Sequence, residues 1–145
     1  MTAHEIDTAI TAIAAVTASV SGVDAAPAFA IFNVRENIFA LHYVMTSQSE
    51  IAPIGTMRDL AVIACDIITP FVDVLSTDLQ EILQIAKAVK LAFVREASSG
   101  GDMFSNTIST FGICRMEFLP NYIYGNTQYI GYRIMLEDVK LEYDL

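Results

Sequence analysis

The residue types that could support catalysis are few and lie far apart in this chain. The two histidines, His4 and His42, are distant in sequence, and the two cysteines, Cys65 and Cys114, form no CxxC pair. Metal sites are typically marked by closely spaced ligands such as HExxH, and the sequence contains no such cluster. A catalytic thiol needs a basic neighbour, and neither cysteine has an obvious one. We therefore predict no enzyme activity, no metal and no cofactor, with both histidines as packing or surface residues and both thiols reduced in the core.

Two further patterns resemble sites only in part. The segment 98–102 (SSGGD) is rich in Ser and Gly, but it lacks the lysine of a phosphate loop and follows a predicted helix instead of preceding one. Asp66 is unusual because it is a carboxylate inside an apolar, strand-like run. Two explanations remain open: Asp66 pairs with an arginine such as Arg58 or Arg115, or it faces a subunit boundary.

The composition favours a single domain, residues 1–145, with a surplus of apolar surface. Hydrophobic residues make up 54% of the chain and charged residues only 17%. Such a surplus indicates a membrane segment, a ligand cavity or subunit contacts. The longest apolar run, 60–75, is interrupted by two aspartates and a proline and is shorter than a membrane-spanning helix needs. The apolar run 9–23 follows acidic instead of basic residues, which argues against a secretory signal.

The net charge of −9 argues against a protein that grips nucleic acid, because such binding depends on Lys and Arg at the phosphates. Five of the six tyrosines lie within 122–143 with few basic residues beside them. This pattern fits a protein interface better than a basic–aromatic nucleic-acid platform, although ordinary sheet packing explains several of these tyrosines equally well.

Hydrophobic periodicity predicts an α+β fold. Two main helices are expected, the first begun by a capping box from Thr2 to Glu5 and ended near Gly22, the second running from Thr77 to about Glu96. The predicted strands are 39–47, 57–69, 107–119 and 127–145, with turns at 48–55 and 120–126 and a possible short strand at 29–32. We expect an antiparallel-rich mixed sheet of about four to five strands, with both helices packed on one face.

The last predicted strand has two different halves. Residues 129–136 are apolar enough to form core sheet, whereas residues 137–145 alternate charged side chains with Val139, Leu141 and Tyr143. The second half therefore has one apolar face with no identified cover within the chain. We predict that Val139, Leu141 and Tyr143, together with Asp66, contribute to a subunit interface.

The order of elements resembles the tail terminator (tail completion) proteins of long-tailed bacteriophages, the lambda-type group. The resemblance is carried by the segment Arg35–Ile38 (RENI) before the strand Leu41–Val44, by the strand 57–68 ending near a proline, by the helix that starts at 78–80, and by the closing strand 129–137 (YIGYRIMLE). It covers most of the chain and rests on element order, length and local composition.

The resemblance implies a homo-hexameric ring that caps the finished tail tube, ends its polymerisation and joins the tail to the head. The implied partners are other copies of the chain, the tail tube protein and a head–tail connector or neck protein, with DNA passing through the lumen unbound and no membrane. Glu50 and Asp102 are candidates for acidic residues facing that lumen. The implied location is the head-proximal end of the virion tail, and the host cytoplasm during assembly. The alternatives are a neck or head-completion protein, or a small α+β ligand-binding domain or enzyme.

Overall fold

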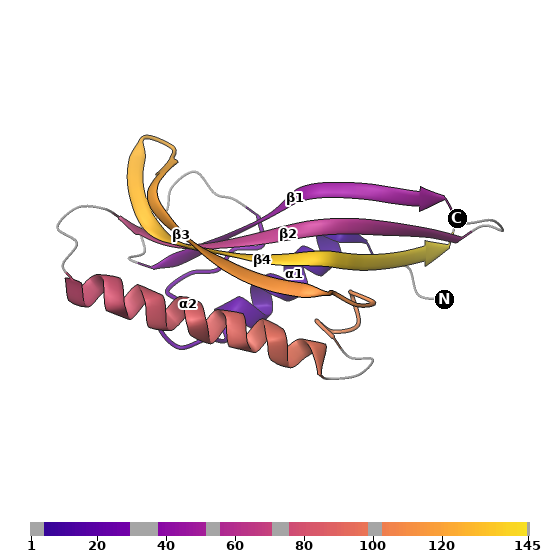
Figure 1. Cartoon of the computed structure of the whole chain (residues 1–145), viewed down its shortest axis with the longest axis horizontal. Coiled ribbons are helices and arrows are strands. Elements are labelled where there is room, and N and C mark those ends of the chain that lie inside the picture. The colour runs from indigo at the N-terminus through magenta and orange to yellow at the C-terminus, as the bar shows by residue number, and fades with distance from the viewer. Residues whose placement is uncertain (1–4, 30–37, 52–55, 71–75, 99–102, 145) are drawn as a thin grey trace.

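Two helices and four long strands form the part of the chain that the computed structural model describes, residues 5–29, 38–51, 56–70, 76–98 and 103–144 (Figure 1). The elements follow one another as α1 (Ile6–Ala18), β1 (Phe39–Ile51), β2 (Thr56–Pro70), α2 (Ser76–Ala97), β3 (Ile113–Tyr124) and β4 (Thr127–Asp144). The predicted α+β class is therefore confirmed.

The four strands form one sheet in the order β1-β2-β4-β3, and every neighbouring pair is antiparallel. We expected a mixed sheet with some parallel pairing. Among the described residues the parallel pairing is a single bridge outside the ladders, between Ala25 and Phe39. The last strand of the chain, β4, lies inside the sheet and pairs with β2 on one side and β3 on the other. This position explains why its first half is so apolar, since Ile134 and Leu136 lie in the core beneath the helices and Tyr129 lies in a smaller cluster.

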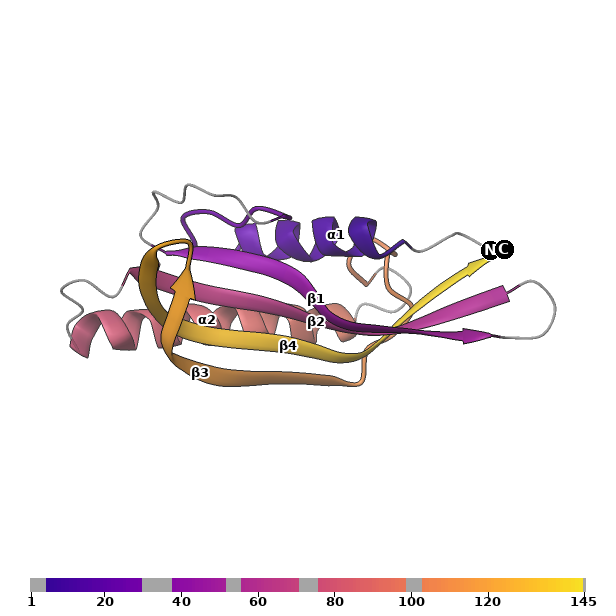
Figure 2. The same cartoon turned by 90° about the horizontal axis from the view of Figure 1, so that it is seen from above.

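Both helices contribute to one core on the same face of the sheet, with α1 beside β1 and α2 beside β4 and β3 (Figure 2). Side chains alternate across a strand, so every second residue of β2 faces this core. The helix-facing residues of β2 are Ala61, Ile63, Cys65 and Ile67, and they pack with Ile10 and Ile13 of α1 and with Ile82, Val89 and Phe93 of α2. No helix within the described ranges is long and apolar enough to span a membrane.

The hairpin of β3 and β4 curls at its tip, away from the layer of helices (Figure 1). The curl accompanies a register shift between Leu119 and Tyr122, and it helps to enclose a small second cluster on the opposite face. That cluster consists of Phe39, Leu41, Ile68 and Tyr129. The predicted turn at 120–126 is wrong for residues 120–124, because β3 continues through Pro120 to Tyr124. Proline is tolerated there since β3 is an edge strand, where a missing N–H on the outer side costs no ladder hydrogen bond.

Two boundaries near the ends of elements also differ from expectation. Helix α1 has Glu5, not Thr2, as its N-cap, and Glu5 makes no side-chain capping bond. Thr2 and residues 30–32 of the possible short strand at 29–32 lie outside the described residues, and Phe29 is not in a strand. Strand β3 begins at Ile113, yet the segment before it still pairs with β4 through Ser109 N–H to the Lys140 carbonyl at 2.9 Å. A register shift of β4 near Asp138, whose φ is 56°, separates the two stretches, so the strand-like pattern from 107 onward has a structural basis.

Candidate functional site

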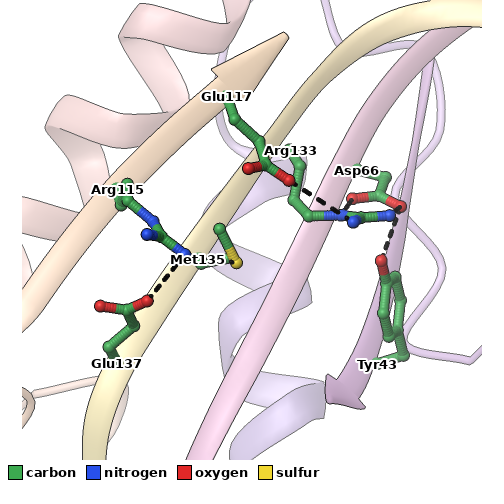
Figure 3. A network of polar contacts seen from close by, with 7 residues as sticks. All are labelled: Tyr43, Asp66, Arg115, Glu117, Arg133, Met135 and Glu137. Atoms are coloured by element: carbon green, nitrogen blue, oxygen red, sulfur yellow. Dashed lines mark hydrogen bonds and ion pairs between the residues drawn. The ribbon is translucent and has the colours of Figure 1, made fainter. Parts of the chain in front are cut away.

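The most organised polar group in the described chain is centred on Asp66, on the sheet face opposite the helices (Figure 3). Asp66 is fully buried. Arg133, its direct partner across β2 and β4, donates from Nε to Oδ1 at 2.9 Å and from Nη2 to Oδ2 at 3.3 Å. Tyr43 of β1 donates its hydroxyl to Oδ2 at 2.8 Å. The carboxylate thus has charge-assisted partners on both sides, which is what a buried charge requires.

The group extends across all four strands. Arg133 Nη1 lies 3.5 Å from Glu117 Oε1 of β3, and its guanidinium lies 5.8 Å from the centre of the Tyr43 ring. One step along the sheet, Arg115 Nη2 pairs with Glu137 Oε1 at 3.0 Å (Figure 3). We call Tyr43, Asp66, Arg133 and Glu117 the polar row. It joins the β1–β2 hairpin to the β3–β4 hairpin, which are far apart in sequence, and it fits one register of the four strands.

The electrostatics of the polar row favour fixed protonation states. Hydrogen bonding to Asp66 raises the pKa of Arg133 above its ordinary value, more than burial lowers it. Burial, followed by the charge of Asp66, raises the pKa of Tyr43. Both groups therefore keep their protons near neutral pH: Arg133 stays cationic and Tyr43 stays a donor. An arrangement of this kind orients side chains and strands, and its Tyr and Arg are not poised to exchange a proton.

The explanation that Asp66 pairs with an arginine is confirmed, but neither arginine named as an example is the partner. Arg58 lies at the far end of β2 and forms a 3.9 Å ion pair with Glu50, and Arg115 pairs with Glu137. The register of β2 against β4 places Arg133 opposite Asp66 instead. A usable signal was present, because Asp66 is the only charged residue in 60–70 and Arg133 the only one in 129–136. Two lone opposite charges in two apolar strands predict each other as partners.

A second buried polar cluster lies between α1 and the sheet. His42 Nδ1 is 2.8 Å from the Pro27 carbonyl, and His42 Nε2 is 3.0 Å from Thr17 Oγ1. Cys65 Sγ lies 3.5 Å from the same Nε2. The expectation that Cys65 has no basic neighbour was therefore wrong. The expectation was wrong because this contact joins residues of β1, β2 and α1, which a local sequence pattern cannot relate to one another.

This cysteine–histidine contact has the wrong electrostatics for a reactive thiolate. Burial lowers the pKa of His42 and raises the pKa of Cys65, so both groups are neutral at physiological pH. The Cys65 side chain is also fully buried. Cys114 is half-buried, and burial raises its pKa to about 11. Both cysteines are free thiols, as predicted, and the His42 cluster acts as a polar anchor for α1 and the Pro27 segment.

The predicted interface residues that the structure describes are buried within the chain and do not lie on an exposed surface. Val139 and Leu141 are fully buried in the main core, so the expectation that their face lacks a cover within the chain is wrong. They face the helix side at the point where Met103, Phe104 and Ile108 also pack. Asp66 is buried as well, which leaves no exposed carboxylate there for a partner subunit. The side chain of Tyr143 lies outside the described residues.

The predicted lumen residues are only partly described. Glu50 lies in β1, not in a hairpin loop, and its side chain is 54% exposed. Asp102 lies outside the described residues. Within the described ranges, no three His, Cys, Asp or Glu side chains are grouped closely enough to hold a metal ion. A scan against protein-family models and a search of curated proteins each found no match.

Proposed function

We propose that the protein is a structural subunit that assembles head to tail into a ring, as a tail terminator on the tail tube of a long-tailed bacteriophage. In this role the ring ends polymerisation of the tube and provides the surface that joins tail to head. The observation that carries the proposal is a sheet whose two edge strands, β1 and β3, are paired on their outer side with no further strand of the described chain, and both expose apolar side chains. The sequence resemblance supplies the identity of the assembly, and the open edges supply a physical means of forming it.

The β1 edge is suited to pairing with another chain. Residues 45–51 (MTSQSEI) are all exposed, and Met45 and Ile51 are 42% and 89% exposed. Natural edge strands are usually protected by lysine, proline, other charges or a β-bulge. This stretch contains neither lysine nor proline, and its protection is limited to the register shift at Met45 and the charge of Glu50. In the described chain, the outer side of β1 meets only the single bridge from Ala25, at its first residue.

The β3 edge offers a complementary surface. Its exposed apolar residues are Ile113, Phe118 and Ile123, at 49%, 48% and 70% exposure. In an all-antiparallel sheet of order β1-β2-β4-β3, the two edge strands run in opposite directions. A second copy that sets its β3 beside β1 therefore continues the antiparallel alternation. Because this contact joins two different patches, its repetition generates a ring when the rotation between copies closes, and an open filament when it does not.

The charge of the chain is compatible with the proposed role. With a net charge of −9, the surface of a ring repels phosphate, which suits a channel that DNA crosses without binding. Glu50 is the described candidate for such a channel surface, because it is exposed near the end of β1. The proposed partners are other copies of the chain, the tail tube protein and the connector, and the proposal includes no cofactor and no reaction.

The test is the mass of the purified protein in solution combined with negative-stain microscopy, alone and mixed with tail tubes. We expect rings that cap one end of each tube and prevent its extension. Gln48→Lys, which places a charge on the exposed β1 edge, is expected to reduce ring formation, whereas Ala15→Lys on the exposed side of α1 is the matched control. A protein that stays monomeric in both conditions contradicts the proposal. Rings that bind the connector and ignore tubes identify a neck protein instead.

A further inference from the structure

A groove of about 550 Å³ lies between α2 and the edge strand β3. Its walls include Leu91 and Val94 of α2 and Met116 of β3, with Lys87 and Lys90 beside them. Leu91 and Val94 are 49% and 44% exposed, although α2 already buries a separate apolar stripe in the core. Helix α2 is thus apolar on two sides, and only one of them is covered within the described chain. We refer to this feature as the α2–β3 groove.

We propose that the α2–β3 groove receives the distal part of the β1–β2 hairpin of a second copy of this chain. This inference rests on the proposed ring assembly and specifies which surfaces meet in it. The distal arm comprises residues 45–51 of β1 and 56–60 of β2, and the end of β1 and the start of β2 project beyond both helices (Figures 1 and 2). Groove and arm belong to opposite edges of the sheet, so their contact joins two copies head to tail.

The side chains of the arm match those of the groove. Ile51 is 89% exposed, the largest exposure among the apolar side chains of β1 and β3 given above, and Ser49 and Asp59 lie on the same face of the hairpin as Ile51. Ser49 donates its hydroxyl to Asp59 at 2.6 Å, which holds the carboxylate in place on that face. An isoleucine with a neighbouring carboxylate therefore faces a groove that is apolar between two lysines.

The charges favour a second copy as the occupant. The chain has 17 acidic and 8 basic residues, so Lys87 and Lys90 form a local positive site on an acidic protein. Such a site attracts an acidic surface, and other copies of this chain carry one in abundance. The arm is an extension of the β1 edge and the groove borders the β3 edge. The same head-to-tail contact that pairs β1 with β3 therefore brings arm and groove to one interface.

The test compares single variants by sedimentation over a range of concentrations. Leu91→Asp alters the groove and Ile51→Asp alters the arm, and both positions are exposed, so folding is expected to be retained and is verified by circular dichroism. Each is expected to weaken assembly about tenfold to a hundredfold, the effect of losing one buried aliphatic side chain. Ala15→Asp introduces the same charge on the exposed side of α1 and is expected to assemble like the unmodified chain.

Mixing the two variants tests the direction of the contact. The Leu91→Asp chain keeps an intact arm and the Ile51→Asp chain keeps an intact groove, so a one-to-one mixture is expected to form heterodimers that cannot extend. If grooves instead packed against each other across a two-fold axis, Ile51→Asp would assemble normally and the mixture would form no such heterodimer. That result overturns the inference.

Charge supplies an independent test of the occupant. The double variant Lys87→Glu with Lys90→Glu is expected to lose assembly at low salt, and Arg95→Glu, on the same helix outside the groove, is expected to retain it. If the Leu91→Asp and Ile51→Asp variants assemble at the same concentrations as the unmodified chain, the inference about the groove and the arm is overturned. The ring proposal then stays intact. A chain that never assembles, even with tail tubes, overturns both.

Discussion

Arg133 and Asp66 face each other directly across β4 and β2, and two hydrogen bonds of 2.9 and 3.3 Å join the guanidinium to the fully buried carboxylate. A buried ion pair contributes little net stability when compared with a well-packed apolar pair, but removing one partner leaves an uncompensated charge. The pair is thus better understood as a device that specifies the register of the two central strands.

This relationship predicts an asymmetric response to mutation. Arg133→Met is expected to lower the free energy of unfolding by about 3 kcal/mol, the low end for a broken buried pair, because Arg133 retains some contact with water. The double variant Asp66→Leu with Arg133→Met is expected to recover most of that loss, since no buried charge remains. Urea denaturation measures both. A double variant as unstable as Arg133→Met alone would contradict this account.

The buried His42 cluster predicts a pH dependence of stability. Burial lowers the pKa of His42 below its ordinary 6.5, so the folded protein binds fewer protons than the unfolded chain as the pH falls below 6.5. The contribution of neutral, buried His42 to the free energy of unfolding is complete above pH 6.5. It is lost as the pH falls from 6.5 through the pKa of His42 in the folded protein. The free energy of unfolding then falls by at most about 1.4 kcal/mol per pH unit.

Thermal unfolding at a series of pH values measures this slope. We expect His42→Gln to reduce the slope just below pH 6.5. An unaltered slope in His42→Gln would show that another group titrates in that range.

Leu141 distinguishes a core role from an interface role. Because its side chain is fully buried within the chain's own core, Leu141→Ala is expected to lower the free energy of unfolding by about 3 kcal/mol. Ile51→Ala, at an exposed position, is expected to change it by less than about 0.5 kcal/mol. Denaturation of both variants at concentrations where the protein is monomeric measures the difference. If Leu141→Ala left the free energy of unfolding of the monomer unchanged, Leu141 would have to be an interface residue instead of a core residue.

Gly131 of β4 lies where the backbone of β2 leaves no room for a Cβ atom. A Cβ at this position would collide with the backbone carbonyl oxygen of Ile67. We expect Gly131→Ala to cost roughly 3 kcal/mol or more, the upper end for overpacking, because backbone cannot move aside as a side chain can. Gly125→Ala is the control: its φ is 62°, with nothing within 4 Å of the added methyl, so it is expected to cost only about 1 kcal/mol. Equal melting temperatures for the two variants would contradict the prediction.

The elements best predicted from sequence are those with long local patterns. Helix α2 was expected from Thr77 to about Glu96 and runs from Ser76 to Ala97, and β2 was expected at 57–69 and runs from Thr56 to Pro70. Strand β3 was placed less well, because Pro120 is a turn signal in isolation. Whether a proline ends a strand depends on whether a neighbouring strand needs a backbone donor at that position, because proline has no N–H. Only the position of β3 at the edge of the sheet answers that question.

By itself, the sequence determined the α+β class, the order of the helices and strands, and the apolar character of β2 and β4, because hydrophobic periodicity is a local property of the chain. Only the tertiary structure decided that Asp66 meets Arg133, that Cys65 meets His42, and that Val139 and Leu141 are covered from within. Each of these contacts joins segments far apart in sequence, and each depends on strand order and register. A one-residue slip would turn every one of these side chains to the opposite face.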